Sequence, residues 1–191
     1  MVAAFRGYAV VSADGFIADD RGRMPDALRF DADWTYFQAA LDAADVTMLG
    51  RHTHEAAPNV KGRRRLVVSR GVRAVIQEDA RTWWVNSEDV APASAVAAVA
   101  GAAADTAVVG GTGVFSWILE ESGFEEFHLS LAHHVMLGAG RPLFEDINGL
   151  DAAITKLAGK GLETEERFWF DEEAGLELLI LRRPSEPSTS D

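Results

Sequence analysis

Short apolar runs recur along the chain and predict the strands of a sheet. Five of them are typical of buried strands and cover residues 8–12, 46–50, 65–69, 82–86 and 107–111. Residues 126–137 predict a longer strand, and residues 168–170 and 176–182 predict a hairpin that turns at 172–175. Residues 73–78 are ambiguous, and residues 154–162 fit either a strand or a short helix.

Segments with the spacing of an α-helix lie between several of these predicted strands. One apolar face repeats at Trp34, Phe37, Leu41 and Ala44. Asp31 or Asp33 can cap the start of that helix, and residues 94–104 and 114–122 predict two more helices. Strands that alternate with helices favour an α/β fold with a mostly parallel sheet covered by helices. The final hairpin adds antiparallel strands at one edge.

Length and composition indicate one globular domain without a targeting segment. The 191 residues suit a single domain, which we expect at 1–183, followed by a disordered polar tail at 184–191. No apolar run reaches the roughly 18 residues of a membrane span. Residues 1–7 lack the apolar core of a signal peptide. We therefore expect a cytoplasmic protein without membrane contact.

The content of cysteine and histidine restricts the chemistry. The chain has no cysteine, which excludes disulfides and thiolate sites. Of the five histidines, His52 and His54 are two residues apart, and His133 and His134 are adjacent. Neither spacing is the i, i+4 pair that places two ligands on one helix face, so we expect no metal site.

The formal net charge of −12 argues against nucleic acid as a partner, because such binding depends on neutralising phosphates. Residues 61–73 depart from this balance, since they contain six of the 18 Lys and Arg residues and no acid. A positive segment of this size suggests a small anion rather than a long polyanion. The other interpretation is a solvated loop beside a strand.

Two glycine-marked strand ends are candidate phosphate sites. The first follows the strand at 107–111 and opens a helix, whose free N–H groups and partial positive charge suit a diphosphate. Its candidate residues are Gly110, Gly111, Thr112, Gly113 and Val114. Glycine-rich turns of this kind also serve packing alone, so both interpretations stay open. The spacing is not that of a G-x-G-x-x-G nucleotide-binding turn.

The second glycine-marked end follows the strand at 46–50. A glycine, a cation and a hydroxyl stand together there, at Gly50, Arg51, His52 and Thr53. A turn into a helix capped by Thr53 is the alternative. The strand at 65–69 ends near Ser69 and Arg70, which form a third, basic end. Parallel strand ends converge on one crevice, so three phosphates of one NADPH account for all three.

Asp33, at the start of the first helix, is the candidate acid. Its carboxyl group can face the crevice and relay a proton or bind a substrate N–H. The alternative is a capping or first-turn acid that balances the helix dipole.

The order of these motifs resembles that of dihydrofolate reductase over roughly residues 5–145. The matching segments are 9–10, 16–18, 24–25, 48–53 with Glu55, 66–70, and 109–111 with Phe115, together with Asp33 and Phe37. The segments SADGFIA at 12–18, HLSL at 128–131 and LGAGRPLF at 137–144 are more similar to the reductase domain of bacterial riboflavin biosynthesis. That family is the C-terminal domain of the bifunctional deaminase-reductase.

This resemblance implies a three-layer α/β/α fold with about eight strands, and an NADPH-dependent oxidoreductase similar to 5-amino-6-(5-phosphoribosylamino)uracil reductase. Hydride would pass to a C=N or C=O carbon of a small heterocyclic or sugar-derived substrate. Asp14, Asp33 and Phe37 would border the substrate, and Ser69 and Arg70 would meet the 2′-phosphate. Relatives with long C-terminal strands suggest a homodimer.

Two departures from the resemblance limit it. Asp26 stands where folate reductases have a tryptophan after Met-Pro, and the cysteine-dependent zinc deaminase domain is absent. Dihydrofolate reductase itself, and a non-catalytic NADP(H)-binding protein on the same scaffold, remain alternatives.

Overall fold

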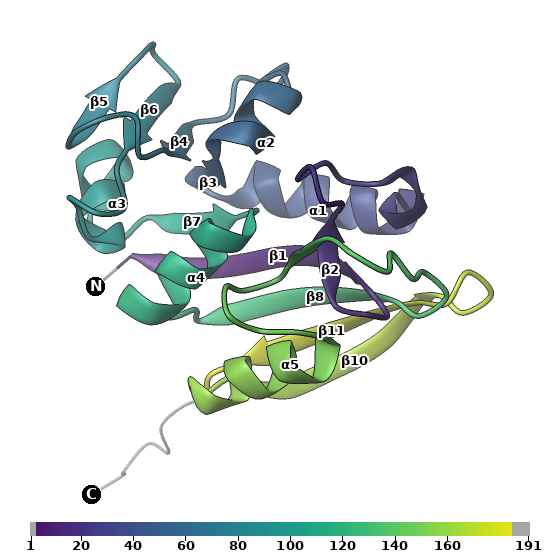
Figure 1. Cartoon of the computed structure of the whole chain (residues 1–191). Coiled ribbons are helices and arrows are strands. Elements are labelled where there is room, and N and C mark those ends of the chain that lie inside the picture. Colours follow the sequence, from purple (N-terminus) through teal and green to yellow (C-terminus); the bar gives the residue numbers. More distant parts are fainter. Residues whose placement is uncertain (1–2, 185–191) are drawn as a thin grey trace, which may run out of the picture.

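A computed structural model describes residues 3–184, and the central feature is a nine-stranded sheet (Figure 1). Its strands are β1 (Ala4–Ser12), β3 (Val46–Gly50), β4 (Arg65–Val68), β5 (Val75–Gln77), β6 (Thr82–Val85), β7 (Asp105–Val108), β8 (Glu126–Ala132), β10 (Glu163–Asp171) and β11 (Leu176–Arg182). They lie in the order β10-β11-β8-β1-β7-β3-β4-β6-β5. The six strands from β8 to β6 in this order are parallel, whereas β5, β10 and β11 pair antiparallel with their neighbours.

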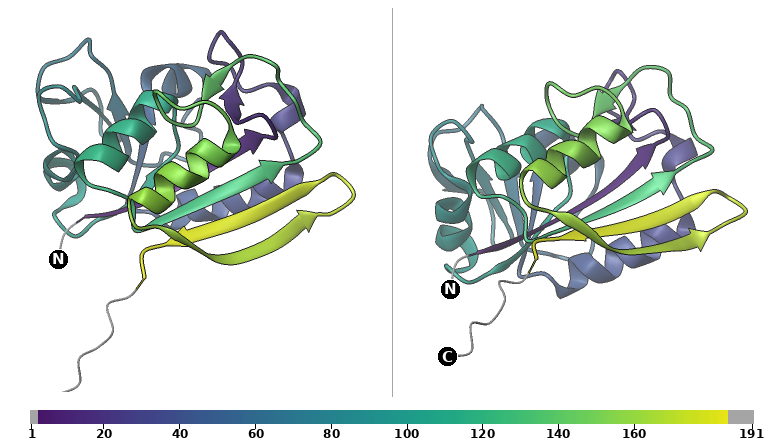
Figure 2. Two further views of the ribbon diagram at one scale, coloured as in Figure 1. Left: turned by 60° about the horizontal axis from the view of Figure 1, so that its bottom comes forward. Right: turned by 90° about the horizontal axis from the view of Figure 1, so that it is seen from below.

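Helices cover both faces of the sheet. They are α1 (Asp31–Ala43), α2 (Arg51–Ala56), α3 (Pro92–Ala100), α4 (Thr112–Glu121) and α5 (Leu150–Gly159), with a 3-10 turn η1 (Asp26–Leu28). Helices α4 and α5 lie on one face and α1 on the other (Figure 2). Two short strands, β2 (Phe16–Ala18) and β9 (Arg141–Pro142), form a separate pair beside the sheet.

The main core lies between the sheet and helices α3, α4 and α5. Four fully buried rings, Phe115, Phe124, Phe127 and Phe144, pack against one another with centroid distances of 5.0 to 6.4 Å. Strand β8 alternates its side chains between the two faces, as a strand must. Phe127 and Leu129 therefore enter this core, while His128 and Ser130 face α1.

The three-layer α/β/α fold and its C-terminal hairpin are confirmed, with nine strands in place of eight. The predicted strand at 126–137 is wrong beyond Ala132, because the chain turns there and Val135 N–H donates to the Ala132 carbonyl. Residues 150–159 form helix α5, and residues 75–77 form the short edge strand β5. The predicted tail at 184–191 lies outside the described residues apart from Pro184.

Within residues 3–184 no helix combines the length and the apolar character that crossing a bilayer requires.

Candidate active site

The two glycine-marked strand ends meet at the carboxyl edge of the parallel strands. Gly50 N–H donates to the Gly110 carbonyl at 2.8 Å, and Val109 N–H donates to the Met48 carbonyl at 2.9 Å. Gly50 also pairs with Val68, so Ser69 lies one residue beyond the same edge. The predicted convergence of these three strand ends is therefore confirmed as geometry.

The glycine turn before α4 leaves room for a ligand. Gly110 has a φ of +103°, which favours glycine, and its peptide bond to Gly111 is cis. A Cβ atom added to Gly111 would meet no atom within 4 Å, so open space adjoins this backbone. The N–H groups of Thr112 and Gly113, the first two residues of α4, have no carbonyl partner within the helix, whereas those of Val114 and Phe115 bind the Gly111 carbonyl. The turn therefore presents donors to an open surface.

Two predicted residues of this turn, Val114 and Thr112, make contacts within the protein. Val114 is 5% exposed, and its N–H donates to the Gly111 carbonyl at 2.9 Å. The Thr112 hydroxyl donates to the Pro142 carbonyl at 2.6 Å. The Val114 side chain packs against Gly50 and the Thr112 hydroxyl binds a loop carbonyl, so the donors that the turn can offer a ligand are backbone N–H groups.

Helix α2 places its predicted residues on the surface beside that turn. Gly50 is the N-cap, without a side-chain cap, so the interpretation of Thr53 as a cap is wrong. Arg51 is exposed and lies 3.4 Å from the Glu55 carboxylate, one helical turn away. His52 is exposed and Thr53 is half-buried.

Ser69 and Arg70 follow β4. Ser69 N–H donates to the Val85 carbonyl at 2.9 Å, and the Ser69 hydroxyl oxygen accepts from Gly71 N–H at 3.2 Å. Arg70 is exposed, and none of the ion pairs within residues 3–184 involves it. Among the described residues its guanidinium group is therefore not engaged by a carboxylate.

Three other cations of the basic segment, Lys61, Arg63 and Arg65, are bound by groups of the protein itself. Lys61 and Arg63 both bind the Asp42 carboxylate on α1 at 2.6 Å, and their hydrogen bonds lower the pKa of Asp42. Arg65 donates to the Ala57 carbonyl at 2.7 Å. The small-anion interpretation is thus wrong for these residues, because the partner acid comes from a distant part of the sequence.

Asp33 lies in the first turn of α1, half-buried against β8. The Ser130 hydroxyl donates to its carboxylate at 2.5 Å. Burial raises the pKa of Asp33, and the Ser130 hydrogen bond only partly offsets this. The helix N-cap is Phe30 and has no side-chain cap, so the capping interpretation is wrong, whereas Asp31 and Asp33 do lie in the first turn as the other form of that alternative has it. Phe37, one turn later, is half-buried, with Trp34 at 5.8 Å between ring centroids.

Asp14 joins two of the singled-out segments. Its carboxylate accepts from the Ser12 hydroxyl at 2.6 Å, from Gly138 N–H at 2.7 Å and from Leu137 N–H at 3.1 Å. Burial raises the pKa of Asp14, but these hydrogen bonds outweigh it and the net pKa is lowered. The carboxylate thus holds the loop at Leu137 and Gly138. Its contact with a substrate stays a prediction.

The segments 12–18 and 137–144 are parts of one structure. Phe16 pairs with Pro142 across β2 and β9. At Gly140 an added Cβ would stand 2.2 Å from the Ala18 carbonyl oxygen, so only glycine permits this approach. Because the Thr112 hydroxyl binds the Pro142 carbonyl, three motifs that are far apart in sequence pack together beside the turn before α4.

Sequence reasoning missed the polar residues beneath α1. Ser130 holds Asp33, and His128 binds Tyr36 with 2.7 Å between Nδ1 and the hydroxyl oxygen. The sequence feature that could have revealed these residues is the alternation of polar residues at 126, 128 and 130 within an apolar strand.

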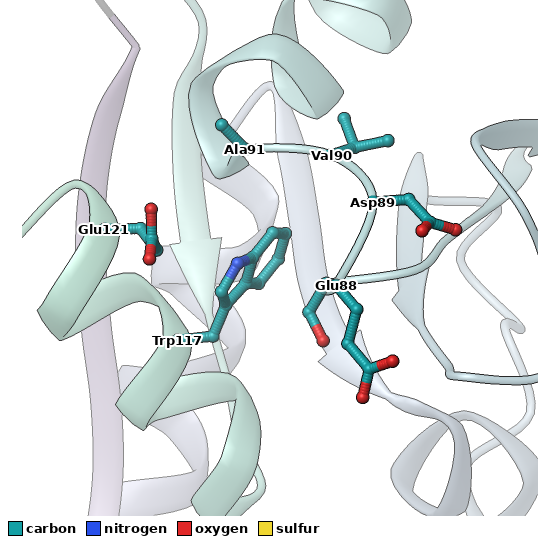
Figure 3. A pocket seen from close by; sticks show the side chains of 7 residues that line it. Glu88, Asp89, Val90, Ala91, Trp117 and Glu121 are labelled. Carbon is teal, nitrogen blue, oxygen red and sulfur yellow. The ribbon is translucent and has the colours of Figure 1, made fainter.

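A small cavity of about 200 Å³ lies between residues 87–91 and α4 (Figure 3). Its lining includes Trp117 and three carboxylates, those of Glu88, Asp89 and Glu121. This negative lining does not suit a phosphate, so we assign no part of an anionic ligand to it. Within residues 3–184 no cluster of side chains suited to a metal ion is present.

No protein-family model and no curated protein matches the chain. Solved structures do. A candidate riboflavin biosynthesis protein from Shewanella sp. PV-4 has a TM-score of 0.66 at 20% identity, covering 95% of this chain and 99% of that chain. Dihydrofolate reductase from Enterococcus faecalis, complexed with NADP(H) and RAB-propyl, has a TM-score of 0.63 at 17% identity, covering 95% and 97%.

A third solved structure is longer than this chain. It is the diaminohydroxyphosphoribosylaminopyrimidine deaminase/5-amino-6-(5-phosphoribosylamino)uracil reductase from Thermotoga maritima, with a TM-score of 0.65 at 14% identity. The match covers 96% of this chain but 57% of that one. Together the three similarities show that this chain has the dihydrofolate-reductase-like fold.

Proposed function

We propose that this protein is an NADPH-dependent reductase that transfers hydride to a C=N or C=O carbon of a small heterocyclic or sugar-derived substrate, as pyrimidine reductases of riboflavin biosynthesis do. The observation that carries the proposal is the meeting of Gly50 and Gly110 at 2.8 Å. This contact brings together the two glycine-marked strand ends that are candidate phosphate sites. The fold supports it, since two of the similar structures are reductases by name.

The residues present fit a dinucleotide. Open space at Gly111 lets a diphosphate approach the backbone, and the N-terminus of α4 favours its charge. Helix α2 begins directly after Gly50 and supplies Arg51, His52 and Thr53 next to the contact between Gly50 and Gly110. When bound, NADPH supplies the hydride. The protein binds and orients the reactants and excludes water.

Asp33 is the proton donor in this proposal. A substrate C=N or C=O group that receives hydride on carbon needs a proton on its heteroatom. The raised pKa of Asp33 favours the protonated form that can give one. Phe37 then borders the substrate one helical turn further on.

Replacing Arg70 by alanine is expected to weaken NADPH binding about tenfold or more and to leave NADH binding unchanged. A lost charged hydrogen bond to the 2′-phosphate costs roughly 1.5–3 kcal/mol. Fluorescence titration with both nucleotides measures this. Arg73→Ala is the matched control, because it removes an exposed arginine of the same segment. Equal loss for both nucleotides, or for both variants, would contradict the assignment.

Glu145→Gln is expected to tighten NADPH binding about two- to threefold, the size of an exposed charge interaction. The Glu145 carboxylate lies 3.4 Å from the place of a Cβ on Gly113, so it repels a diphosphate at this helix end. The gain should shrink as salt is added. Glu163→Gln, on the distant strand β10, makes the same change in net charge and serves as control. An unchanged Kd at low salt would place the diphosphate elsewhere.

Oxidation of NADPH with a panel of pyrimidine, pterin and keto-sugar substrates tests the reaction itself. Turnover of a pyrimidine substrate supports the proposal. Turnover of dihydrofolate alone would favour the alternative enzyme. Asp26 argues against that outcome, because it stands where folate reductases have a tryptophan, and here it is exposed and pairs with Arg29 at 3.2 Å. NADPH binding without turnover of any substrate would favour a non-catalytic binding protein.

A further inference from the structure

Helix α1, which presents Asp33, packs on the sheet mainly through half-buried side chains. Among its residues only Leu41 is buried. The rings of its apolar stripe are half-buried: Tyr36 lies 5.3 Å from Phe170 and Phe37 lies 6.4 Å from Tyr8 between ring centroids. The position of the helix therefore depends on its polar contacts as well as on this packing.

Two such contacts join α1 to β8 side by side. The first is the hydrogen bond from Ser130 to Asp33 at 2.5 Å. The second joins the Tyr36 hydroxyl to His128 Nδ1 at 2.7 Å. Asp33 and Tyr36 are three residues apart on one helix face, and His128 and Ser130 are two apart on one strand face. These two contacts hold the N-terminal half of the helix, whereas Lys61 and Arg63 hold Asp42 near its C-terminal end.

His128 is built into the sheet as a fixed neutral group. It is 7% exposed, and its ring stacks on Tyr8 with 4.6 Å between centroids. Burial lowers its pKa, and the effect of Glu126 in the opposite direction is smaller. Its Nε2 lies 3.1 Å from the Glu126 carboxylate. The neutral ring thus donates from Nε2 and leaves Nδ1 to accept from Tyr36.

Charged side chains from several strands lie around the His128 ring and hold the Glu126 carboxylate in place. Arg182 from β11 donates to the Glu126 carboxylate at 3.0 Å, and Arg6 from β1 lies at 3.6 Å. Arg182 also binds Glu166 of β10 at 2.6 Å. The anchor beneath Tyr36 is therefore fixed by four strands of the sheet, independently of any substrate.

We propose that His128 is a positioning residue: by anchoring Tyr36 it fixes α1 on the sheet and keeps the Asp33 carboxyl group on Ser130, facing the crevice. This inference rests on the proposed role of Asp33 as proton donor. Reacting groups tolerate little displacement, and a shift of about 1 Å can cost roughly 10²-fold in rate. A helix that loses the Tyr36 contact but keeps its other contacts should lose part of this rate, about tenfold, mainly in kcat.

The two tyrosines of the chain provide a matched test, since both contact the His128 ring. Tyr36→Phe removes the hydrogen bond to Nδ1. Tyr8→Phe removes a hydroxyl that forms no hydrogen bond within residues 3–184, and it keeps the stacked ring. We expect Tyr36→Phe to lower kcat about tenfold with little change in KM. Tyr8→Phe should change neither. Equal kinetics of the two variants would overturn the proposal.

A second measurement does not require turnover. Carbon-13 NMR titration of the Asp33 carboxyl group reports its pKa directly. In Tyr36→Phe the pKa should fall toward the ordinary value of aspartate, because a loosened α1 admits water to the carboxyl group. In Tyr8→Phe it should stay raised. An unchanged pKa in Tyr36→Phe overturns the positioning role. A fallen pKa in an enzyme without any reductase activity upholds it and rejects the proposed function alone.

Rescue by a conservative variant separates positioning from simple stability. Glutamine at position 128 can accept from Tyr36 and donate to Glu126, whereas leucine can do neither. His128→Gln should retain most of the wild-type kcat and the raised Asp33 pKa, and His128→Leu should lose both. If glutamine fails as completely as leucine in a folded protein, the hydrogen bond is not what positions α1.

Discussion

Replacing Gly7 by alanine is expected to destabilise the protein by about 3 kcal/mol, near the upper end of the usual cost of overpacking. Gly7 lies within β1, and a Cβ there would stand 2.4 Å from two ring carbons of Phe127. Atoms cannot approach this closely, so either the strand or the ring has to move.

The ring has little freedom to move. Phe127 is fully buried, with Phe124 at 5.0 Å, Phe115 at 5.5 Å and Phe144 at 5.9 Å between ring centroids. A close-packed interior transmits such a clash to its neighbours instead of absorbing it. The strain therefore falls on the pairing of β1 with β8, where Gly7 and Phe127 are register partners.

Urea unfolding of three variants measures the effect. Gly159→Ala is the control, because Gly159 ends helix α5 and a Cβ there meets no atom within 4 Å. It should be neutral or slightly stabilising. Phe127→Leu should lower the cost of Gly7→Ala, so that the double variant is more stable than the sum of the single effects. Strict additivity would show that the clash is relieved by the backbone.

This example shows where sequence reasoning fell short. The pattern predicted the first strand at 8–12, where a short apolar run lies. The strand begins at Ala4 because β7 and β8 pair with it from both sides. Helix and strand periodicity is local and was read correctly for most elements, whereas this extension depends on partners far along the chain.

The candidate site divides in the same way. Gly50, Gly110 and Asp33 could be proposed from the sequence because glycines and acids at element boundaries are local signals. The pairing of Lys61 and Arg63 with Asp42 could not be found, since it joins a loop to a helix about 20 residues away. Ser130 was hidden for the same reason: its importance comes from Asp33, which approaches it across 97 positions of sequence.

Asp33→Asn is expected to lower kcat/KM by roughly 10²-fold or more while NADPH binding stays unchanged, because a positioned proton donor contributes 10²–10⁴-fold. In the wild type the protonated form is the active one, so kcat/KM should fall as pH rises through the raised pKa of Asp33. Asparagine has no proton to give and should remove this step. Measuring kcat/KM and nucleotide Kd across pH checks both. An unchanged pH profile in the variant would assign the proton donor elsewhere.

The same substitution should make the protein more stable at neutral pH. The folded pKa of Asp33 is raised above its ordinary value of 3.8, so the folded state binds this proton more tightly than the unfolded state. The stabilisation is fully present below that ordinary value and is lost as pH rises through the folded pKa. Asparagine is neutral at every pH and can still accept from Ser130. The difference in urea midpoint, variant minus wild type, should therefore grow with rising pH and level off above the folded pKa. A difference that stays constant with pH would mean that the Asp33 carboxylate is as well solvated in the folded protein as in the unfolded chain, and that the site does not hold a proton for catalysis.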